Sequence, residues 1–101
     1  MTQPATKIKN PEMEEYWEKA LNSERGIAMT LETPNQAIRR SLELNAFRSS
    51  IRKFNASIYP EDHPMHGASR WDKLAVTKDP ENPCRILIKE KVVQVVTVEE
   101  L

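Results

Sequence analysis

Residues 33–55 read TPNQAIRRSLELNAFRSSIRKFN, and this stretch decides the fold. It opens with a capping box: the Thr33 hydroxyl can accept a hydrogen bond from the backbone of Gln36, whose side chain can reach back, and Pro34 suits the first helical position. No glycine or proline interrupts the rest of the stretch. The pattern therefore predicts one long helix over about 34–54.

This predicted helix carries two apolar stripes. The wider stripe consists of Ala37, Leu44, Phe47, Ile51 and Phe54, which fall within roughly one-third of the helical circumference. The narrower stripe, on another side of the helix, consists of Ile38, Leu42 and Ala46. Two stripes are typical of a helix that is sandwiched between layers or that shares one face with a partner.

The same helix concentrates the positive charge of the chain. The 101 residues contain 15 bases and 15 acids, so the net charge is zero. Five bases nevertheless lie between residues 33 and 54, where Glu43 is the only acid. Arg48 and Arg52 are four residues apart and should point the same way, as contacts with successive phosphates require. These bases could instead contact an acidic protein, or pair with acids of the predicted helix over 11–25 and of the C-terminal strands.

Outward from this helix, the sequence predicts five further elements. Asn10 and Pro11 are typical of a helix start, and Ile27, Met29 and Leu31 alternate with more polar residues as in a half-buried strand. The expected elements are a helix over about 11–25 and strands over 27–31, 74–76, 85–88 and 92–98, with a loop over 55–72 and a turn over 79–83.

The order helix–strand–helix–strand–strand–strand favours the α+β class, with a small antiparallel or mixed sheet and helices on one face. Residues 1–9 are expected to form a loose tail, and residues 10–101 a single domain. The strand at 92–98 is apolar on both faces, so it is either buried or an edge that pairs with another chain. A homodimer through residues 92–98 is therefore one expectation.

Aromatic residues flank the long loop. Tyr59 and Trp71 could stack on bases beside the basic helix, or anchor the two ends of the loop to the core. The residues predicted to bind nucleic acid or a partner are these two together with the five bases: Arg39, Arg40, Arg48, Arg52, Lys53, Tyr59 and Trp71.

Two histidines lie within the loop, next to an acid. His63 and His66, near Asp62, resemble part of a metal or acid–base site, for which Cys84 or Asp72 would have to supply further ligands. No zinc-type spacing is present, and two glycines in the whole chain are too few for a phosphate-binding loop. We expect no catalytic residue, metal or cofactor, and a small metal-dependent enzyme centred on the two histidines is the alternative.

The composition favours a location in the cytoplasm. Cys84 is the only cysteine, so no disulfide can form within the chain, and this favours a reducing compartment. The N-terminus lacks the apolar run of a signal peptide, and no stretch is long and apolar enough to span a membrane.

A set of residues across the centre of the chain resembles small accessory proteins of tailed bacteriophages. The set consists of Ala37, Arg40, Phe47, Arg48 and Arg52, then residues 58–64, and Gly67, Ser69, Trp71 and Asp72. The resemblance implies an intracellular protein, phage-encoded, that contacts nucleic acid or host machinery. The function expected from the sequence is a non-enzymatic module that binds nucleic acid through its basic helix. The alternative is an interaction or inhibitor protein that docks on host machinery.

Overall fold

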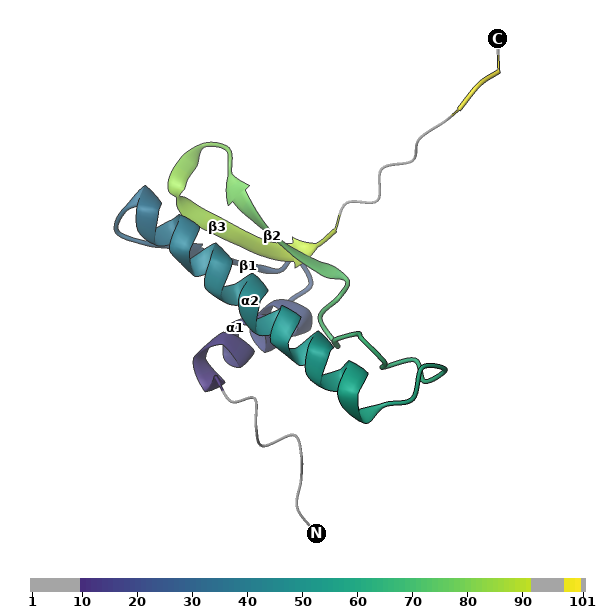
Figure 1. Cartoon of the computed structure of the whole chain (residues 1–101). Helices are drawn as coiled ribbons and strands as arrows, with labels where there is room; N and C mark the ends of the chain where they lie inside the picture. The colour runs from purple at the N-terminus through teal and green to yellow at the C-terminus, as the bar shows by residue number, and fades with distance from the viewer. Residues whose placement is uncertain (1–9, 92–97, 101) are drawn as a thin grey trace.

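The computed structural model describes residues 10–91 and 98–100. Its elements follow one another as α1 (Pro11–Asn22), β1 (Ile27–Thr30), α2 (Pro34–Ile58), β2 (Leu74–Asp79) and β3 (Asn82–Glu90). Figure 1 shows α2 running in nearly the same direction as β3 and extending past the end of the sheet, with α1 beside it. The predicted α+β class and the order of these elements are confirmed. The predicted tail at 1–9 lies outside the described residues, as does the predicted strand at 92–98 apart from Val98.

The sheet has the order β1-β3-β2, and both pairings are antiparallel. Ile27 lies opposite Ile88, and Val76 lies opposite the same residue from the other side. The hairpin between β2 and β3 turns at Pro80 and Glu81, so β3 begins at Asn82 rather than at 85. The central strand is therefore longer than its apolar residues alone indicated.

The two helices start where the sequence predicts and end elsewhere. Asn10 caps α1, and the Thr33 hydroxyl accepts a hydrogen bond from the Gln36 amide at the start of α2. α1 ends at Asn22, a few residues before Gly26, which has a φ of 80°. α2 continues to Ile58, because no residue before Pro60 breaks a helix and the residue preceding a proline favours extended backbone.

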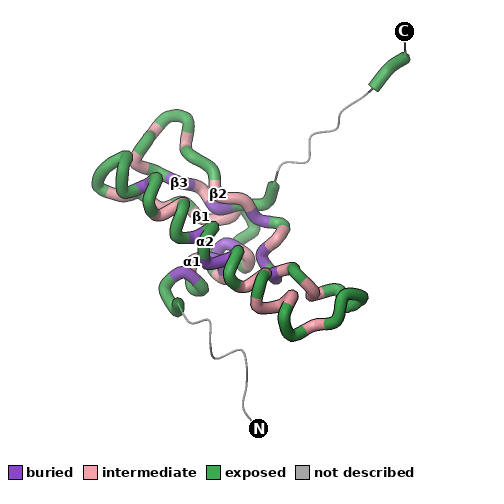
Figure 2. The backbone as a smooth tube through the Cα atoms, in the orientation of Figure 1, coloured by how far each residue is buried: buried purple, intermediate pink, exposed green. Residues whose placement is uncertain are grey.

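The core lies between the helices and one face of the sheet (Figure 2). Trp17 of α1, Leu44 of α2 and Ile86 of β3 are fully buried there. From the wider stripe of α2, Ala37, Leu44 and Phe47 are buried. The narrower stripe points away from the core, since Ile38 is 40% exposed and Leu42 is 65% exposed. No helix among the described residues combines the length and hydrophobicity needed to cross a membrane.

Candidate functional site

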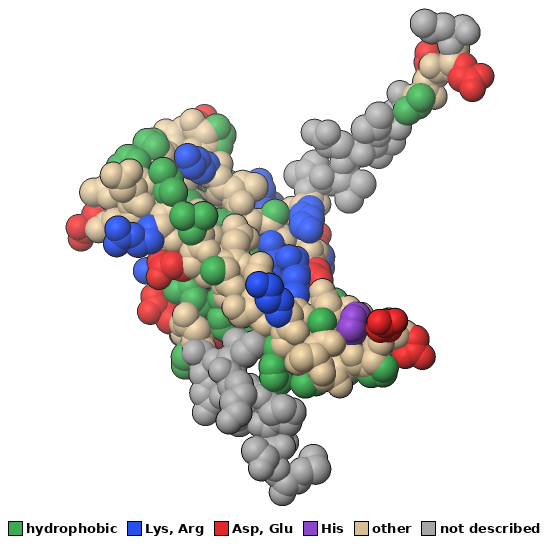
Figure 3. Space-filling model, viewed as in Figure 1, with side chains coloured by type: hydrophobic (Ala, Val, Ile, Leu, Met, Phe, Trp, Pro, Cys, Tyr) green, Lys and Arg blue, Asp and Glu red, His purple; other side chains and the backbone are tan. Residues whose placement is uncertain are grey.

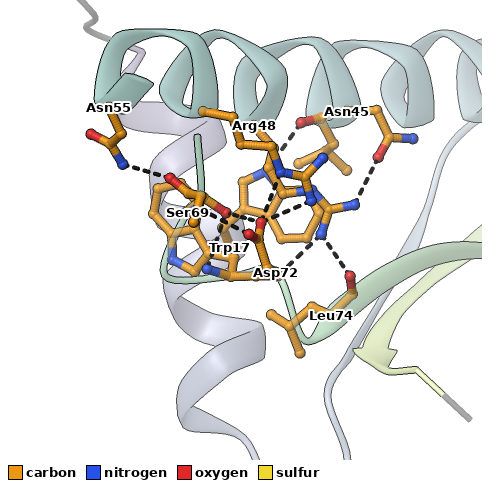
Figure 4. A network of polar contacts seen from close by, with 11 residues as sticks. Trp17, Asn45, Arg48, Asn55, Ser69, Asp72 and Leu74 are labelled. Carbon is orange, nitrogen blue, oxygen red and sulfur yellow. Dashed lines mark hydrogen bonds and ion pairs between the residues drawn. The ribbon is translucent and has the colours of Figure 1, made fainter. Parts of the chain in front are cut away.

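Arg48 is the most buried charged residue of α2. Only 7% of its surface is exposed, and its Nη1 donates to the backbone oxygens of Trp71 at 3.1 Å and Leu74 at 2.6 Å. Its Nη2 donates to the Asn45 side chain at 3.4 Å. Figure 4 shows Arg48 reaching from α2 to the Leu74 oxygen at the start of β2, and bonding to Asn45 within α2 itself. Arg48 therefore binds its own chain and is not available to a phosphate.

The guanidinium of Arg48 also lies over an aromatic ring. Its central carbon is 4.4 Å from the centre of the Trp17 ring, a distance typical of a cation–π contact. Burial lowers the pKa of Arg48 and the charge of Arg52 lowers it further, against the opposing charge of Asp72. An arginine nevertheless stays protonated in a protein, so a full charge is held inside the fold.

Arg52 is held by a carboxylate from the same segment. Its Nε and Nη2 both lie 2.8 Å from Asp72 Oδ1. Ser69 donates to Asp72 through its backbone amide at 3.0 Å and its hydroxyl at 2.6 Å. Burial alone would raise the pKa of Asp72, but the hydrogen bonds from Ser69 and the charge of Arg52 bring it below its ordinary value. The carboxylate is therefore ionised and largely neutralises Arg52.

One turn further along α2, Asn55 donates to the Ala68 oxygen at 2.6 Å. We call these contacts the polar clamp: Arg48, Arg52 and Asn55 of α2, bound to residues 68–74 of the segment that leads into β2 (Figure 4). The prediction that Arg48 and Arg52 point the same way is confirmed. Their direction, however, is toward the chain's own backbone and Asp72.

Arg40 is also used within the chain. Its Nη1 lies 3.3 Å from a carboxylate oxygen of Glu12 and donates to the Tyr16 hydroxyl at 3.1 Å, and its Nε lies 3.5 Å from Glu43. Burial would lower the pKa of Arg40, but the Tyr16 hydrogen bond and the two carboxylates raise it. The interpretation that bases of this helix pair with acids of α1 is confirmed for Arg40.

The two aromatic residues that flank the loop are engaged as well. Trp71 is buried and stacks on Trp17, with ring centres 6.1 Å apart, so it anchors the loop to the core. Tyr59 is half-buried and stacks on His63 at 4.3 Å. The burial of Trp71 removes its ring from any nucleic-acid base, whereas Tyr59 keeps part of its surface exposed.

The histidines of the loop make contacts within the loop itself. His63 Nδ1 accepts a hydrogen bond from the Met65 amide at 3.0 Å, and His66 Nδ1 lies 2.9 Å from the Tyr59 oxygen. Among residues 10–91 and 98–100, no group of three or more His, Cys, Asp or Glu side chains is placed to hold a metal ion. Cys84 is half-buried, with its sulfur 3.9 Å from the Glu32 oxygen. The structure thus does not bring the candidate ligands of the sequence together.

Two of the seven predicted residues remain on the outer side of α2. Arg39 and Lys53 are exposed, and no carboxylate of the described residues lies within ion-pair distance of either. Lys53 lies 14 positions after Arg39 on the helix, which corresponds to about 21 Å along its axis. In Figure 3, which views the molecule from the α2 side, basic side chains do not form a continuous stripe and hydrophobic ones lie among them.

Ile38 and Leu42 also lie on this outer side, although the charge and aromatic patterns do not predict them as binding residues. The signal that could have found them is the second apolar stripe, which had already indicated a shared face. We define the outer face of α2 by Ile38, Arg39, Leu42, Ala46 and Lys53, all exposed.

Comparisons with known proteins give no relative to guide the assignment. No protein-family model, curated protein sequence or solved structure matches this chain. The resemblance to bacteriophage accessory proteins therefore stays a prediction.

The ionised state of Asp72 leads to a prediction about pH. Because its pKa is depressed in the folded protein, its ion pair stabilises the fold above the unfolded-state pKa of about 3.9, and this contribution is lost as the pH falls through the folded value. Asp72→Asn should lower the free energy of unfolding near neutral pH by about 1 kcal/mol, a modest value because the side chain is 38% exposed. The difference from the wild type should shrink below about pH 3.

Urea unfolding of both proteins across this pH range measures the effect. Glu61→Gln is the matched control, since the exposed Glu61 carboxylate lies in the same loop region outside the polar clamp. A difference between Asp72→Asn and the wild type that stays constant with pH would contradict the role given to the ionised carboxylate.

Proposed function

We propose that this chain is a non-enzymatic binding module that docks on an acidic protein surface through the outer face of α2. The observation that carries the proposal is that the bases of this helix fall into two groups, one bound within the chain and one exposed. Three of its five bases are bound inside the chain, whereas the other two lie beside an apolar stripe that the described residues leave partly exposed.

The composition of the outer face suits a protein partner. Ile38 and Leu42 are four residues apart, so they form adjacent projections on the helix surface. Leucine-sized side chains contribute about 1.5–3 kcal/mol each when they are fully buried, which makes them the energetic centre of the contact. Arg39 and Lys53 then select a partner with negative charge, because charges at the rim of an interface act mainly on specificity and association rate.

A nucleic-acid partner fits these residues less well than a protein partner does. Two exposed bases about 21 Å apart would neutralise few phosphates, and affinity for nucleic acid depends on how many are neutralised. Trp71 is buried against Trp17 and one face of Tyr59 is occupied by His63, which leaves little aromatic surface for bases to stack on. If the chain is phage-encoded, the acidic partner belongs to the host machinery and is met in the cytoplasm, where the free thiol of Cys84 stays reduced.

Titration with two defined probes tests the proposal. The first probe is a synthetic amphipathic helical peptide with leucines along one side and glutamates beside them, and the second is a mixed-sequence DNA duplex. We expect the peptide to shift backbone amide NMR signals along the outer face of α2. Leu42→Asp should weaken this binding at least about tenfold, because a buried apolar contact is replaced by a charge that repels the glutamates.

Thr77→Asp is the matched control, since it places the same charge at an exposed site on β2. It should leave peptide binding unchanged. Both variants should stay folded, with the dispersed amide NMR spectrum of the wild type and a slightly lower melting temperature, because aspartate is a poorer helix and strand former than the residues it replaces. Two results would refute the proposal: peptide binding that Leu42→Asp does not affect, or duplex binding that depends on Arg39 and Lys53 but not on Leu42. The second result would establish the nucleic-acid function instead.

A further inference from the structure

β1 forms one edge of the sheet and presents unpaired backbone groups. The Leu31 amide donates to the Cys84 oxygen at 2.8 Å. This bond shows which alternate residues of β1 direct their backbone N–H and C=O groups towards β3. Because hydrogen-bonded positions alternate along an antiparallel pair, Ile27 and Met29 bond to β3. The N–H and C=O groups of Ala28 and Thr30 therefore point away from β3, and no described strand pairs with them.

The opposite edge of the sheet is protected, unlike β1. On β2, the Leu74 oxygen accepts a hydrogen bond from Arg48, and Lys78 places an exposed positive charge on the strand. Lysines on edge strands are a common means of preventing pairing between chains. β1, with the sequence Ile-Ala-Met-Thr, contains neither charge nor proline.

We propose that β1 pairs antiparallel with β1 of a second copy of this chain, which joins the two sheets into one. The register follows from the outward-pointing groups: Ala28 of each copy lies opposite Thr30 of the other, with the two-fold axis at Met29. This pairing forms four backbone hydrogen bonds between the copies. It uses none of the residues of the outer face of α2, so it does not depend on the docking role proposed for that face.

The side chains on the helix side of β1 fit this register. Ile27, Met29 and Leu31 are only half-buried, although all three pack against the core. In the proposed pairing, Ile27 meets Leu31 of the second copy and Met29 meets its own equivalent. Apolar cross-strand pairs of this kind contribute roughly 0.2–1 kcal/mol each, and they remove the exposed apolar edge from water.

Charges at the ends of β1 complement one another in the same register. Antiparallel pairing brings Glu32 of one copy to the position of Gly26 in the other. Gly26 lies beside Lys89 of β3, so closely that a side chain at Gly26 would collide with it. With no side chain at Gly26, Glu32 faces Lys89 across two strand spacings, about 9.5 Å, which the two long side chains can span.

Glu32 and Lys89 are both free to form this contact between the two copies. Glu32 and Lys89 are exposed, and neither has an ion-pair partner among the described residues. Arg25 adds a second base at the same end of the strand, and it offsets the neighbouring Glu24. The two-fold axis creates the Glu32–Lys89 contact twice.

Sedimentation velocity of the full chain over a range of concentrations tests the pairing. We expect the wild type to dimerise as concentration rises, and Thr30→Pro to sediment as a folded monomer, because proline removes an outward-pointing donor and leaves the bonds to β3 intact. Lys78→Pro makes the same change at the other edge and should still dimerise. A wild type that stays monomeric throughout, or a Lys78→Pro variant that dissociates as Thr30→Pro does, would overturn the proposal.

Charge reversal gives a second test that leaves the backbone unchanged. Glu32→Lys and Lys89→Glu should each raise the dimer dissociation constant about tenfold, because each replaces two attractive contacts by repulsive ones. The double variant Glu32→Lys with Lys89→Glu should restore dimerisation close to the wild-type level. Failure of the double variant to recover would exclude the proposed register.

Discussion

Arg48→Met should lower the free energy of unfolding by about 3 kcal/mol. Methionine has similar length and keeps much of the packing, but it cannot donate to the carbonyl oxygens of Trp71 and Leu74. The Leu74 oxygen would be left in a buried environment without its hydrogen-bond partner, which is more costly than the net value of the bond itself, while the Trp71 oxygen would keep its bond from the Leu74 amide at 2.9 Å. The cation–π contact with Trp17 would be lost at the same time.

Urea unfolding followed by circular dichroism measures this loss. Arg39→Met is a well-matched control, because it makes the same change on the same helix at an exposed position without an ion pair among the described residues. It should change the stability by less than about 0.5 kcal/mol. Similar losses in the two variants would show that Arg48 contributes only its helix propensity and charge.

Trp17→Ala should be the most damaging single truncation, with a loss of about 4 kcal/mol. Trp17 has no exposed surface, stacks on Trp71 and lies beneath Arg48. Its indole nitrogen also donates to the Leu44 oxygen at 3.2 Å, within the middle of α2. Removing the ring therefore leaves a cavity at the place where α1, α2 and the start of β2 meet.

Trp17→Phe separates packing from hydrogen bonding in this effect. Phenylalanine keeps a ring in the core but cannot donate to the Leu44 oxygen, so it should lose about half as much stability as Trp17→Ala. Thermal unfolding provides the comparison, since each kcal/mol corresponds to roughly 4–8 °C in a domain of this size. Equal shifts for the two variants would contradict a role for the ring in packing.

Local patterns predicted most of the fold. The cap at Thr33, the long helix after it and the wider apolar stripe depend on residues a few positions apart, and these features are confirmed. The predicted ends of the helices were less accurate, since α1 is shorter and α2 is longer than predicted. The end of a helix depends on which contacts are available to its last turn, and these come from other elements.

The candidate site could be predicted only in part, for a physical reason. A spacing of four residues shows that Arg48 and Arg52 share a direction, but it does not show what lies in that direction. Their partners, Asp72 and the carbonyl oxygens near it, come from a segment 20 or more residues away. A local charge count therefore overstated the basic surface, because it could not subtract charges that the fold neutralises.

The polar clamp has a consequence for chain length in the loop that it closes. Asn55 bound to Ala68 and Arg52 bound to Asp72 join the two ends of the connection between α2 and β2, while its tip around residues 61–64 is exposed. For a loop closed in this way, doubling the length costs only about 0.6 kcal/mol of closure entropy. The tip is therefore the part of this domain where added residues, from evolution or from a labelling tag, disturb neither the core nor the edge of the sheet.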